Sequence, residues 1–247
     1  MKTIGVIPAR YASSRFPGKP LALIDGKPLI ERVWSRASLC RQLDEVIIAT
    51  DDRRIRQTAE AFGAHSVMTS AACASGTDRI AEVARKYAKD ASVFINIQGD
   101  EPLISPALID RLVLALNNNP SIPCVTAAYP INGTKDAANP DIVKVVTDEN
   151  GCAMYFSRSP VPYARAKRKP DCLKHLGIYG YRRQFLLNFA RWKPTRLEQV
   201  EMLEQLRILE KGYKIKVVAS PQDSFGVDVP GDIEKIETIL RKRGQHG

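Results

Sequence analysis

The first half of the chain alternates short apolar segments with segments whose apolar residues recur at helical spacing. Buried strands are predicted at residues 3–7, 46–50, 67–69 and 93–97. Helices are predicted between them: one that Pro28 opens, one from Asp51 or Asp52 to about Phe62 with Gly63 as its stop, and one from about Thr77. Strands and helices that alternate at these lengths form right-handed crossover units with a parallel sheet, so we expect an α/β fold.

The second half has a different pattern. Strands are predicted at residues 143–147, 153–157 and 176–181, without full crossover helices between them. An amphipathic helix over 197–209, a strand at 215–219 and a helix at 231–241 complete the chain. We therefore expect a single domain, residues 1–247, with a core at about 1–128 and 212–247 and an inserted β-rich lobe at about 129–211.

Composition excludes several classes of protein. Of the 247 residues 44% are hydrophobic, which is enough to bury a large core. No stretch approaches the roughly 20 apolar residues that cross a bilayer. The opening segment, residues 1–8, is too short for a secretory signal, so we expect a cytoplasmic protein without membrane insertion. The five cysteines are scattered without a C-x-x-C pair, which favours free thiols over disulfides or a zinc site.

The net charge of +10 admits three kinds of partner: nucleic acid, an anionic membrane surface or anionic small substrates. For the basic run at residues 165–169 and the basic end at 241–243 we favour a solvated surface. Aromatic residues make up only 7% and do not interleave with the charges, which argues against a stacking platform for single strands. A basic nucleic-acid-binding protein remains the alternative from a different functional class.

A basic loop directly after the first predicted strand is the sharpest candidate site. It carries three cations and two small hydroxyl residues: Arg10, Ser13, Ser14, Arg15 and Lys19. Guanidinium and ammonium groups suit phosphate oxygens, and ligands of open α/β sheets bind beyond the carboxyl ends of strands. The loop is neither a Walker A motif nor a G-x-G-x-x-G loop. We interpret it as a triphosphate-binding loop, the alternative being a basic surface loop.

Carboxylates that follow predicted strands form the second candidate site. Asp100 lies in the segment 98–102, which follows the fourth predicted strand, and it is a candidate Mg²⁺ ligand, while Glu101 can be structural. The alternative for Asp100 is a simple turn before Pro102. Asp228 ends another short apolar stretch, and by itself it fits a metal ligand and a helix-entry residue equally well.

Two further sets of polar residues complete the candidates. Residues 75–79 can bind a ligand at a helix start or only cap that helix, with Thr77 or Asp78 as the N-cap. The candidates of the lobe are Arg158, Arg165, His175, Tyr179, Glu204 and Gln205. A lone histidine before an apolar strand is more often structural, and two polar residues within a helix more often form a solvated face. His175 and Tyr179 lie four residues apart around a predicted strand, so we expect them on one face.

Eight segments carry a resemblance to a known family. They are residues 7–21, 49–51, 75–79, 96–102, 155–158, 175–181, 197–207 and 227–230. In order and over about residues 3–240, they resemble the 3-deoxy-manno-octulosonate (KDO) cytidylyltransferases. The first segment indicates only the broader sugar nucleotidyltransferases, whereas HLGIYGY at 175–181 and LEQVEMLEQLR at 197–207 are more specific. CMP-sialate synthetases usually have asparagine after the loop lysine, where this chain has Pro20.

The resemblance implies a Rossmann-like nucleotidyltransferase core with a mixed sheet and a smaller β-rich lobe for dimerisation and sugar binding. It implies CTP ligands at Arg10, Ser13, Arg15, Lys19, Ser75, Arg79, Gln98 and Asp100, and magnesium ligands at Asp100 and Asp228. It places the KDO pocket at Arg158, Arg165, His175, Tyr179, Glu204 and Gln205. The segment after Arg165 departs most from the family pattern.

The activity implied by the resemblance is transfer of CMP from CTP to KDO, giving CMP-KDO and pyrophosphate for lipopolysaccharide biosynthesis. Arg10, Lys19, Asp100 and Asp228 are the implied catalytic residues, Mg²⁺ is the implied cofactor, and a homodimer is the implied assembly. The alternative within this class is a cytidylyltransferase for a related acid sugar, 8-amino-KDO or sialate.

Overall fold

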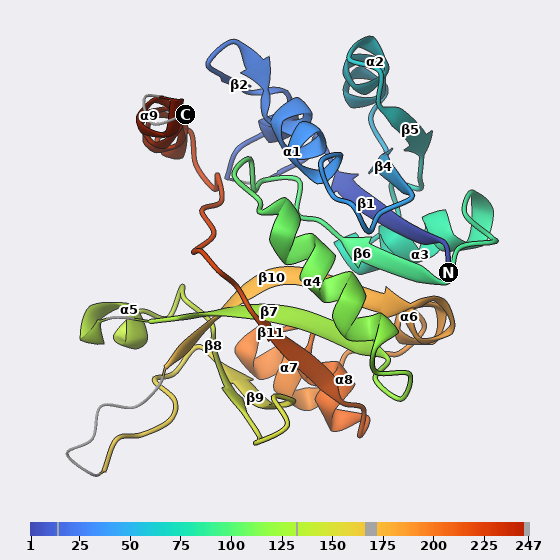
Figure 1. The fold of residues 1–247 in the computed structure, drawn as a ribbon. Coiled ribbons are helices and arrows are strands. Elements are labelled where there is room, and N and C mark those ends of the chain that lie inside the picture. The colour runs from blue at the N-terminus through green and yellow to red at the C-terminus, as the bar shows by residue number, and fades with distance from the viewer. Residues whose placement is uncertain (14, 132, 166–171, 245–247) are drawn as a thin grey trace. The chain divides into compact units, whose positions relative to one another are not determined.

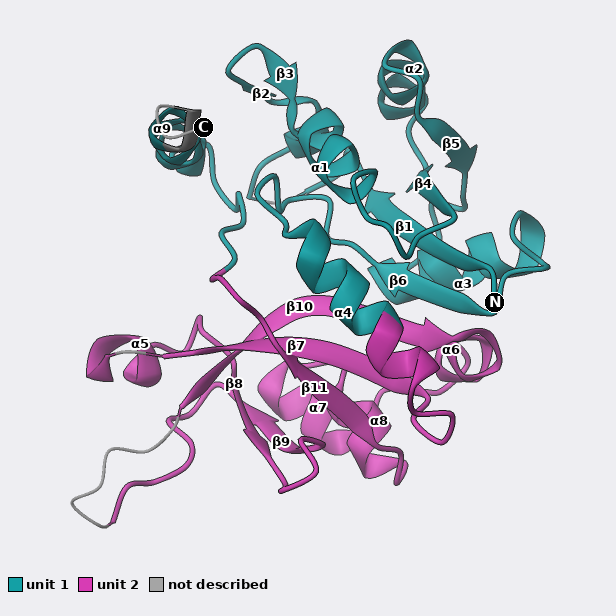
Figure 2. Ribbon diagram, viewed as in Figure 1, with its two compact units in different colours: residues 1–113, 224–247 teal, residues 114–223 magenta. Residues whose placement is uncertain are grey.

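The computed structural model describes residues 1–13, 15–131, 133–165 and 172–244 (Figure 1). The chain divides into two compact units (Figure 2): residues 1–113 with 224–247, and residues 114–223. The lobe expected at about 129–211 lies within the second unit, which begins earlier and ends later because strands at both its ends pair inside it.

The first unit contains a parallel sheet in the order β6–β1–β4–β5. Its strands are β1 Thr3–Ala9, β4 Glu45–Thr50, β5 His65–Met68 and β6 Val93–Asn96. The other elements of this unit are η1 Lys19–Leu21, the hairpin β2 Leu23–Ile24 and β3 Lys27–Pro28, α1 Leu29–Ala37, α2 Arg53–Ala61, α3 Gly76–Lys86 and α9 Asp232–Gly244. Helix α4, Pro106–Asn117, begins in the first unit and ends in the second. The expected parallel α/β sheet is confirmed.

The core of this sheet explains why its strands are visible in the sequence. Ile4, Val6 and Ile7 of β1 are fully buried although they point to both faces. Both faces of a parallel sheet covered by helices are buried. Its strands are therefore continuous apolar runs rather than alternating apolar and polar residues. Burying one such side chain stabilises the fold by about 1.5–3 kcal/mol.

Polar residues set the helix ends of the first unit. Asp52 caps α2 by accepting a hydrogen bond from the Arg54 backbone nitrogen at 2.9 Å. The N-cap of α3 is Ser75, and the expectation of Thr77 or Asp78 is wrong. The Ser75 hydroxyl accepts from the Asp78 nitrogen at 3.2 Å, and the Asp78 carboxylate accepts from the Ser75 nitrogen at 3.1 Å. This reciprocal pair is a capping box, and α3 begins at Gly76, one residue before the predicted start.

The second unit is built on antiparallel pairs with one parallel edge. Strand β11, Ile215–Ala219, pairs in parallel with β7, Cys124–Pro130. Antiparallel pairs then join β7 to β10, Leu173–Arg182, β10 to β8, Lys144–Thr147, and β8 to β9, Ala153–Ser157. The helices are α5 Thr134–Ala138, α6 Arg183–Phe189, α7 Arg196–Glu201 and α8 Leu206–Glu210.

The single helix expected over residues 197–209 is wrong, because two short helices separated by a turn occupy this segment. Met202, which ends α7, has a left-handed backbone with φ of 54° and an exposed side chain. The turn buries Leu203 and lets the Arg207 guanidinium form an ion pair with Glu198 at 2.9 Å. Apolar spacing is nearly the same for both arrangements, so periodicity did not reveal the break.

Among the helices of the described residues, none combines the length and the apolar character that crossing a membrane requires.

Candidate active site

A cavity of about 280 Å³ lies in the first unit, where β1 and β6 end. It is lined by every residue that the sequence analysis assigned to CTP or metal: Arg10, Ser13, Arg15, Lys19, Ser75, Arg79, Gln98, Asp100 and Asp228. The carboxyl ends of parallel strands meet at one edge of a sheet, so loops far apart in sequence converge there. The predicted nucleotide residues are therefore neighbours in space.

Lys19 links the two carboxylates of this cavity. Its ammonium nitrogen lies 2.8 Å from an Asp100 carboxylate oxygen and 3.9 Å from an Asp228 oxygen. It also donates a hydrogen bond to the Val227 carbonyl at 2.8 Å. Arg15 forms a second ion pair with Asp228 at 3.1 Å. The cavity thus brings cations and carboxylates together, which suits a ligand that carries both phosphates and a metal ion.

Two glycines shape the loops around the cavity. Gly18 has a left-handed backbone with φ of 71°, and its nitrogen donates to the Tyr11 carbonyl at 2.9 Å. The Tyr11 ring lies beneath the Arg54 guanidinium, 3.4 Å from its central carbon to the ring centroid. A Cβ at Gly99 would lie 2.9 Å from the Pro8 carbonyl oxygen, so only glycine allows this close approach.

Arg79 and Asp51 form a nearly buried ion pair at the α3 side of the cavity. Arg79 is 3% exposed, and its guanidinium donates to the Asp51 carboxylate at 2.9 Å and to the Thr69 hydroxyl. Ser75 caps α3 and also lines the cavity, so the cap and ligand interpretations of this segment are compatible in the structure. The sequence analysis gave Asp51 only a capping role, although it follows β4 much as Asp100 follows β6.

Glu82 holds the loop that leads into Ser75. Its carboxylate accepts hydrogen bonds from the Ser70 nitrogen at 3.0 Å, the Cys73 thiol at 3.3 Å and the Lys86 ammonium at 2.6 Å. Burial raises the pKa of Glu82, but these bonds outweigh it and lower the pKa to about 2. Burial and the bond to Glu82 raise the pKa of Cys73 to about 11, so this thiol is neutral at pH 7 although it lines the cavity.

Asp100 and Asp228 are carboxylates of the cavity that could hold a magnesium ion. Both carboxylates lie within 4 Å of one ammonium group, so they already surround a cation position. Within the described part of the chain no group of three or more His, Cys, Asp and Glu side chains could hold a metal. Two hard oxygen donors completed by water and substrate phosphates are typical of Mg²⁺.

His175 and Tyr179 lie together in the second unit. Their ring centroids are 5.4 Å apart, and the Phe156 ring meets His175 edge-on at 4.9 Å. They share a face across a bulge in β10, because His175 pairs with Ala128 and Tyr179 with Thr126. Burial lowers the pKa of His175 to about 3, so its ring is neutral at pH 7.

Arg158 is held by backbone carbonyls and by Glu201. Its guanidinium donates to the Glu201 and Pro140 carbonyls at 2.9 and 3.0 Å, while its backbone nitrogen donates to the Glu201 carboxylate at 2.9 Å. The fully buried Lys144 ammonium donates to the Arg158 carbonyl. The sequence analysis missed Glu201 and Lys144, because no local pattern marks a residue that bonds to a distant backbone.

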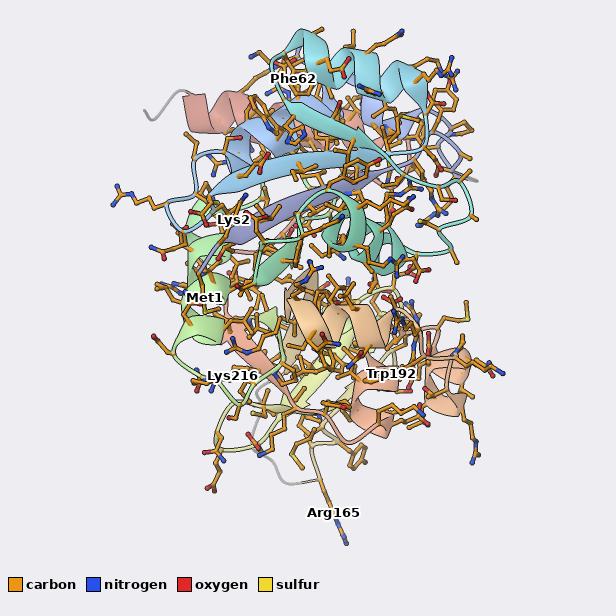
Figure 3. All side chains as sticks on the ribbon, turned by 90° about the vertical axis from the view of Figure 1, so that its right-hand side faces the viewer. Met1, Lys2, Phe62, Arg165, Trp192 and Lys216 are labelled. Atoms are coloured by element: carbon orange, nitrogen blue, oxygen red, sulfur yellow. The ribbon has the colours of Figure 1, made fainter. Side chains whose placement is uncertain are left out.

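The remaining sugar candidates lie in a turn or at the surface of the second unit. Glu204 and Gln205 were expected within one helix, but they lie in the turn between α7 and α8. Glu204 forms an ion pair with Arg207 at 3.2 Å, and Gln205 is 7% exposed. Arg165 is exposed, and Figure 3 shows its side chain directed away from the ribbon. The rest of the basic run, residues 166–169, lies outside the described residues.

Comparisons with known proteins identify the family of the chain. A family model described as cytidylyltransferase matches residues 4–215. A 3-deoxy-manno-octulosonate cytidylyltransferase of Geotalea daltonii is 49% identical over 99% of this chain and 100% of its own length. The chain belongs to the 3-deoxy-manno-octulosonate cytidylyltransferase family. A mitochondrial 3-deoxy-manno-octulosonate cytidylyltransferase of Arabidopsis thaliana is 46% identical, over 98% of this chain and 84% of the relative.

Solved structures place this cytidylyltransferase in the same fold. A CMP:2-keto-3-deoxy-manno-octonic acid synthetase complexed with CTP is 43% identical and superimposes with a TM-score of 0.94, covering 98% of this chain and all of that one. A 4-diphosphocytidyl-2C-methyl-D-erythritol synthase from Anaerococcus prevotii has a TM-score of 0.63 at 17% identity, which shows a shared fold only. The resemblance and the fold class expected from the sequence are confirmed.

One prediction for this cytidylyltransferase follows from the neutral His175. The unfolded histidine has a pKa of about 6.5, so below that pH the unfolded chain binds a proton that the folded chain excludes. The free energy of unfolding should therefore fall as the pH is lowered from about 6.5 towards the folded pKa of about 3. The loss attributable to His175 should be about 1.4 kcal/mol between pH 7.5 and 5.5. Urea denaturation of the wild type and His175→Asn at both pH values measures it, and equal pH slopes would contradict it.

Proposed function

We propose that this cytidylyltransferase transfers CMP from CTP to KDO and releases pyrophosphate, and that CMP-KDO serves lipopolysaccharide biosynthesis. The observation that carries the proposal is the cavity in which Lys19 meets both Asp100 and Asp228 beside a basic loop. The names of the similar proteins support both substrates: 3-deoxy-manno-octulosonate cytidylyltransferase, and a synthetase complexed with CTP.

In the proposed reaction the basic loop binds the triphosphate of CTP. Arg10, Arg15 and Lys19 line the cavity with three positive charges, which offset the charge that builds up on the departing pyrophosphate. Lys19 and Arg15 both form ion pairs with carboxylates of the cavity. Lys19 is the more sheltered, at 16% side-chain exposure against 66% for Arg15, so its charge is less screened by water. Ser75, Arg79 and Gln98 line the same cavity and hold the cytidine part.

Asp100 and Asp228 would hold Mg²⁺ at the same cavity. When bound, the ion would offset charge on the α-phosphate and lower the pKa of the attacking sugar hydroxyl. The chain contributes the ordering of these carboxylates: the Asp100 carbonyl accepts from the Val227 nitrogen at 2.9 Å, which ties the Asp100 turn to the segment that carries Asp228. Catalysis then rests mainly on positioning and charge stabilisation.

The acid sugar requires a cation for its carboxylate and mixed donors and acceptors for its hydroxyls. Arg158 supplies a guanidinium charge, although two backbone carbonyls take part of its hydrogen-bonding capacity, and Arg165 supplies a second cation on the same unit. His175, Tyr179, Glu204 and Gln205 offer hydrogen-bonding groups to the hydroxyls. A site built around such bonds discriminates against sugars that lack the matching hydroxyl.

A cytoplasmic homodimer is the proposed assembly. The second unit exposes Met154, Val200 and Met202 at 65, 73 and 76% of their surface, and burial of large apolar side chains stabilises subunit contacts. Sedimentation equilibrium should give twice the mass of the 27.4 kDa chain. A monomer at micromolar concentration would contradict this assembly.

The activity is tested by pyrophosphate release from CTP. With Mg²⁺ present we expect release when KDO is added and none without a sugar, and EDTA should abolish it. Parallel assays with 8-amino-KDO and sialate test the choice of acid sugar, and assays with UTP test the choice of nucleotide. Faster turnover with another sugar would show that this sugar, rather than KDO, is the preferred substrate. No release of pyrophosphate with any acid sugar would refute the proposed reaction.

A further inference from the structure

A buried hydroxyl of β7 contacts the imidazole of His175. Thr126 is fully buried, and its Oγ1 lies 3.0 Å from His175 Nε2. The same oxygen lies 2.8 Å from the Ile178 carbonyl oxygen and 3.2 Å from the Leu176 carbonyl oxygen. This convergence arises at the bulge of β10, where the register shifts between Leu176 and Tyr179 and turns extra carbonyls towards β7.

The arrangement determines where the protons lie. A threonine hydroxyl has one proton to donate, and the two carbonyl oxygens can only accept. If the hydroxyl donated to His175 Nε2, two oxygens would lie 2.8 Å apart with lone pairs facing each other and no proton between them, which is unfavourable. The consistent network has Oγ1 donating to Ile178 and accepting from a proton on Nε2.

A neutral imidazole carries a single proton. Because burial lowers the pKa of His175 to about 3, the ring stays neutral at physiological pH. A proton on Nε2 therefore leaves Nδ1 unprotonated, as a hydrogen-bond acceptor. The Phe156 and Tyr179 rings both pack against the imidazole, and His175 keeps part of its surface exposed while Thr126 does not.

We infer that Thr126 is a positioning residue of the sugar site, which fixes His175 in the Nε2–H tautomer so that Nδ1 accepts a hydrogen bond from a hydroxyl of the acid sugar. The inference rests on the proposed function for its sugar part, but the tautomer follows from the contacts of Thr126 and the neutral state of the buried ring. It assigns His175 one role, acceptor, and gives Thr126 a role in sugar binding without contact with the sugar.

Matched variants of Thr126 test the kinetic part. Thr126→Val keeps the shape of the side chain and removes the hydroxyl, whereas Thr126→Ser keeps the hydroxyl. We expect Thr126→Val to raise the KM for KDO by about 10-fold, the lower end of the 10–100-fold loss that follows removal of the hydrogen-bond partner of a metal-ligating histidine. The KM for CTP should change by less than about 2-fold, and Thr126→Ser should stay close to the wild type. In a His175→Asn background, Thr126→Val should add no further increase.

A spectroscopic measurement tests the tautomer independently of activity. The chain has only three histidines, so ¹⁵N-histidine labelling with His175→Asn as the assignment control resolves the ring nitrogens of His175. We expect an unprotonated Nδ1 in the wild type and Thr126→Ser, and a mixture of tautomers in Thr126→Val. A proton on Nδ1 in the wild type would overturn the inference.

The kinetic outcomes separate the inference from the proposed function. If the wild type turns over KDO and Thr126→Val leaves both KM values unchanged, or raises both equally, Thr126 is merely structural and the inference is overturned. If the wild type does not use KDO, the proposed function and the sugar part fail together, and the spectrum still decides the tautomer. Should Thr126→Val not fold, Thr126→Ala supplies the kinetic comparison.

Discussion

Replacing Asp100 by asparagine should lower the rate of CMP transfer by at least about 100-fold while the chain stays folded. Asparagine keeps the shape of the side chain but removes the negative charge that faces Lys19 at 2.8 Å. The Asp100 side chain is 31% exposed, so its oxygens are accessible to a metal ion, and the part-exposed ion pair contributes little to stability. The rate at saturating CTP and KDO, with Mg²⁺ varied, measures the effect.

Two control variants distinguish the loss of a carboxylate in the cavity from the loss of a carboxylate elsewhere in the chain. Asp228→Asn should act in the same direction and raise the Mg²⁺ concentration needed for half-maximal rate. Asp90→Asn removes an equally acidic side chain of the same unit, 68% exposed and paired with Lys2, and should leave the rate unchanged. A normal rate for Asp100→Asn at saturating Mg²⁺ would remove Asp100 from the catalytic site.

The cavity lined by Arg10 and Asp100 could be predicted from the sequence, because the topology of the sheet brings these residues together. Strand β1 is a continuous apolar run, and the candidate residues Arg10 and Asp100 each follow a strand of the same parallel sheet. Parallel strands align their carboxyl ends, so residues 90 positions apart in sequence must approach one another. No knowledge of side-chain contacts is needed for that step.

The candidate sugar residues of the second unit are harder to predict, because their positions depend on irregular backbone. The left-handed Met202 puts Glu204 and Gln205 in a turn, and apolar periodicity does not register a single residue of this kind. The partner of His175 depends on the bulge that brings Thr126 opposite Tyr179. A lone threonine in an apolar run carries no local signal of that contact.

The ion pair between Arg79 and Asp51 should be the most costly to break. Arg79 is 3% exposed, and Arg79→Met would leave the Asp51 carboxylate, 20% exposed, without its guanidinium partner. Breaking a buried pair costs about 3–5 kcal/mol, and we expect the lower end because Asp51 keeps some contact with water. Urea denaturation measures the loss, and Arg85→Met is the matched control because Arg85 is exposed on the same helix.

A double variant separates the structural role of Arg79 from its proposed contact with cytidine. Arg79→Met combined with Asp51→Leu removes both charges, so the double variant should be more stable than the sum of the single losses predicts, by at least about 1 kcal/mol. CTP affinity should not recover with stability, because no apolar side chain can replace the guanidinium that lines the cavity. Recovery of CTP binding in the double variant would mean that Arg79 acts only by supporting the loop around it. Losses that add within about 0.5 kcal/mol would show that the two side chains are not energetically coupled.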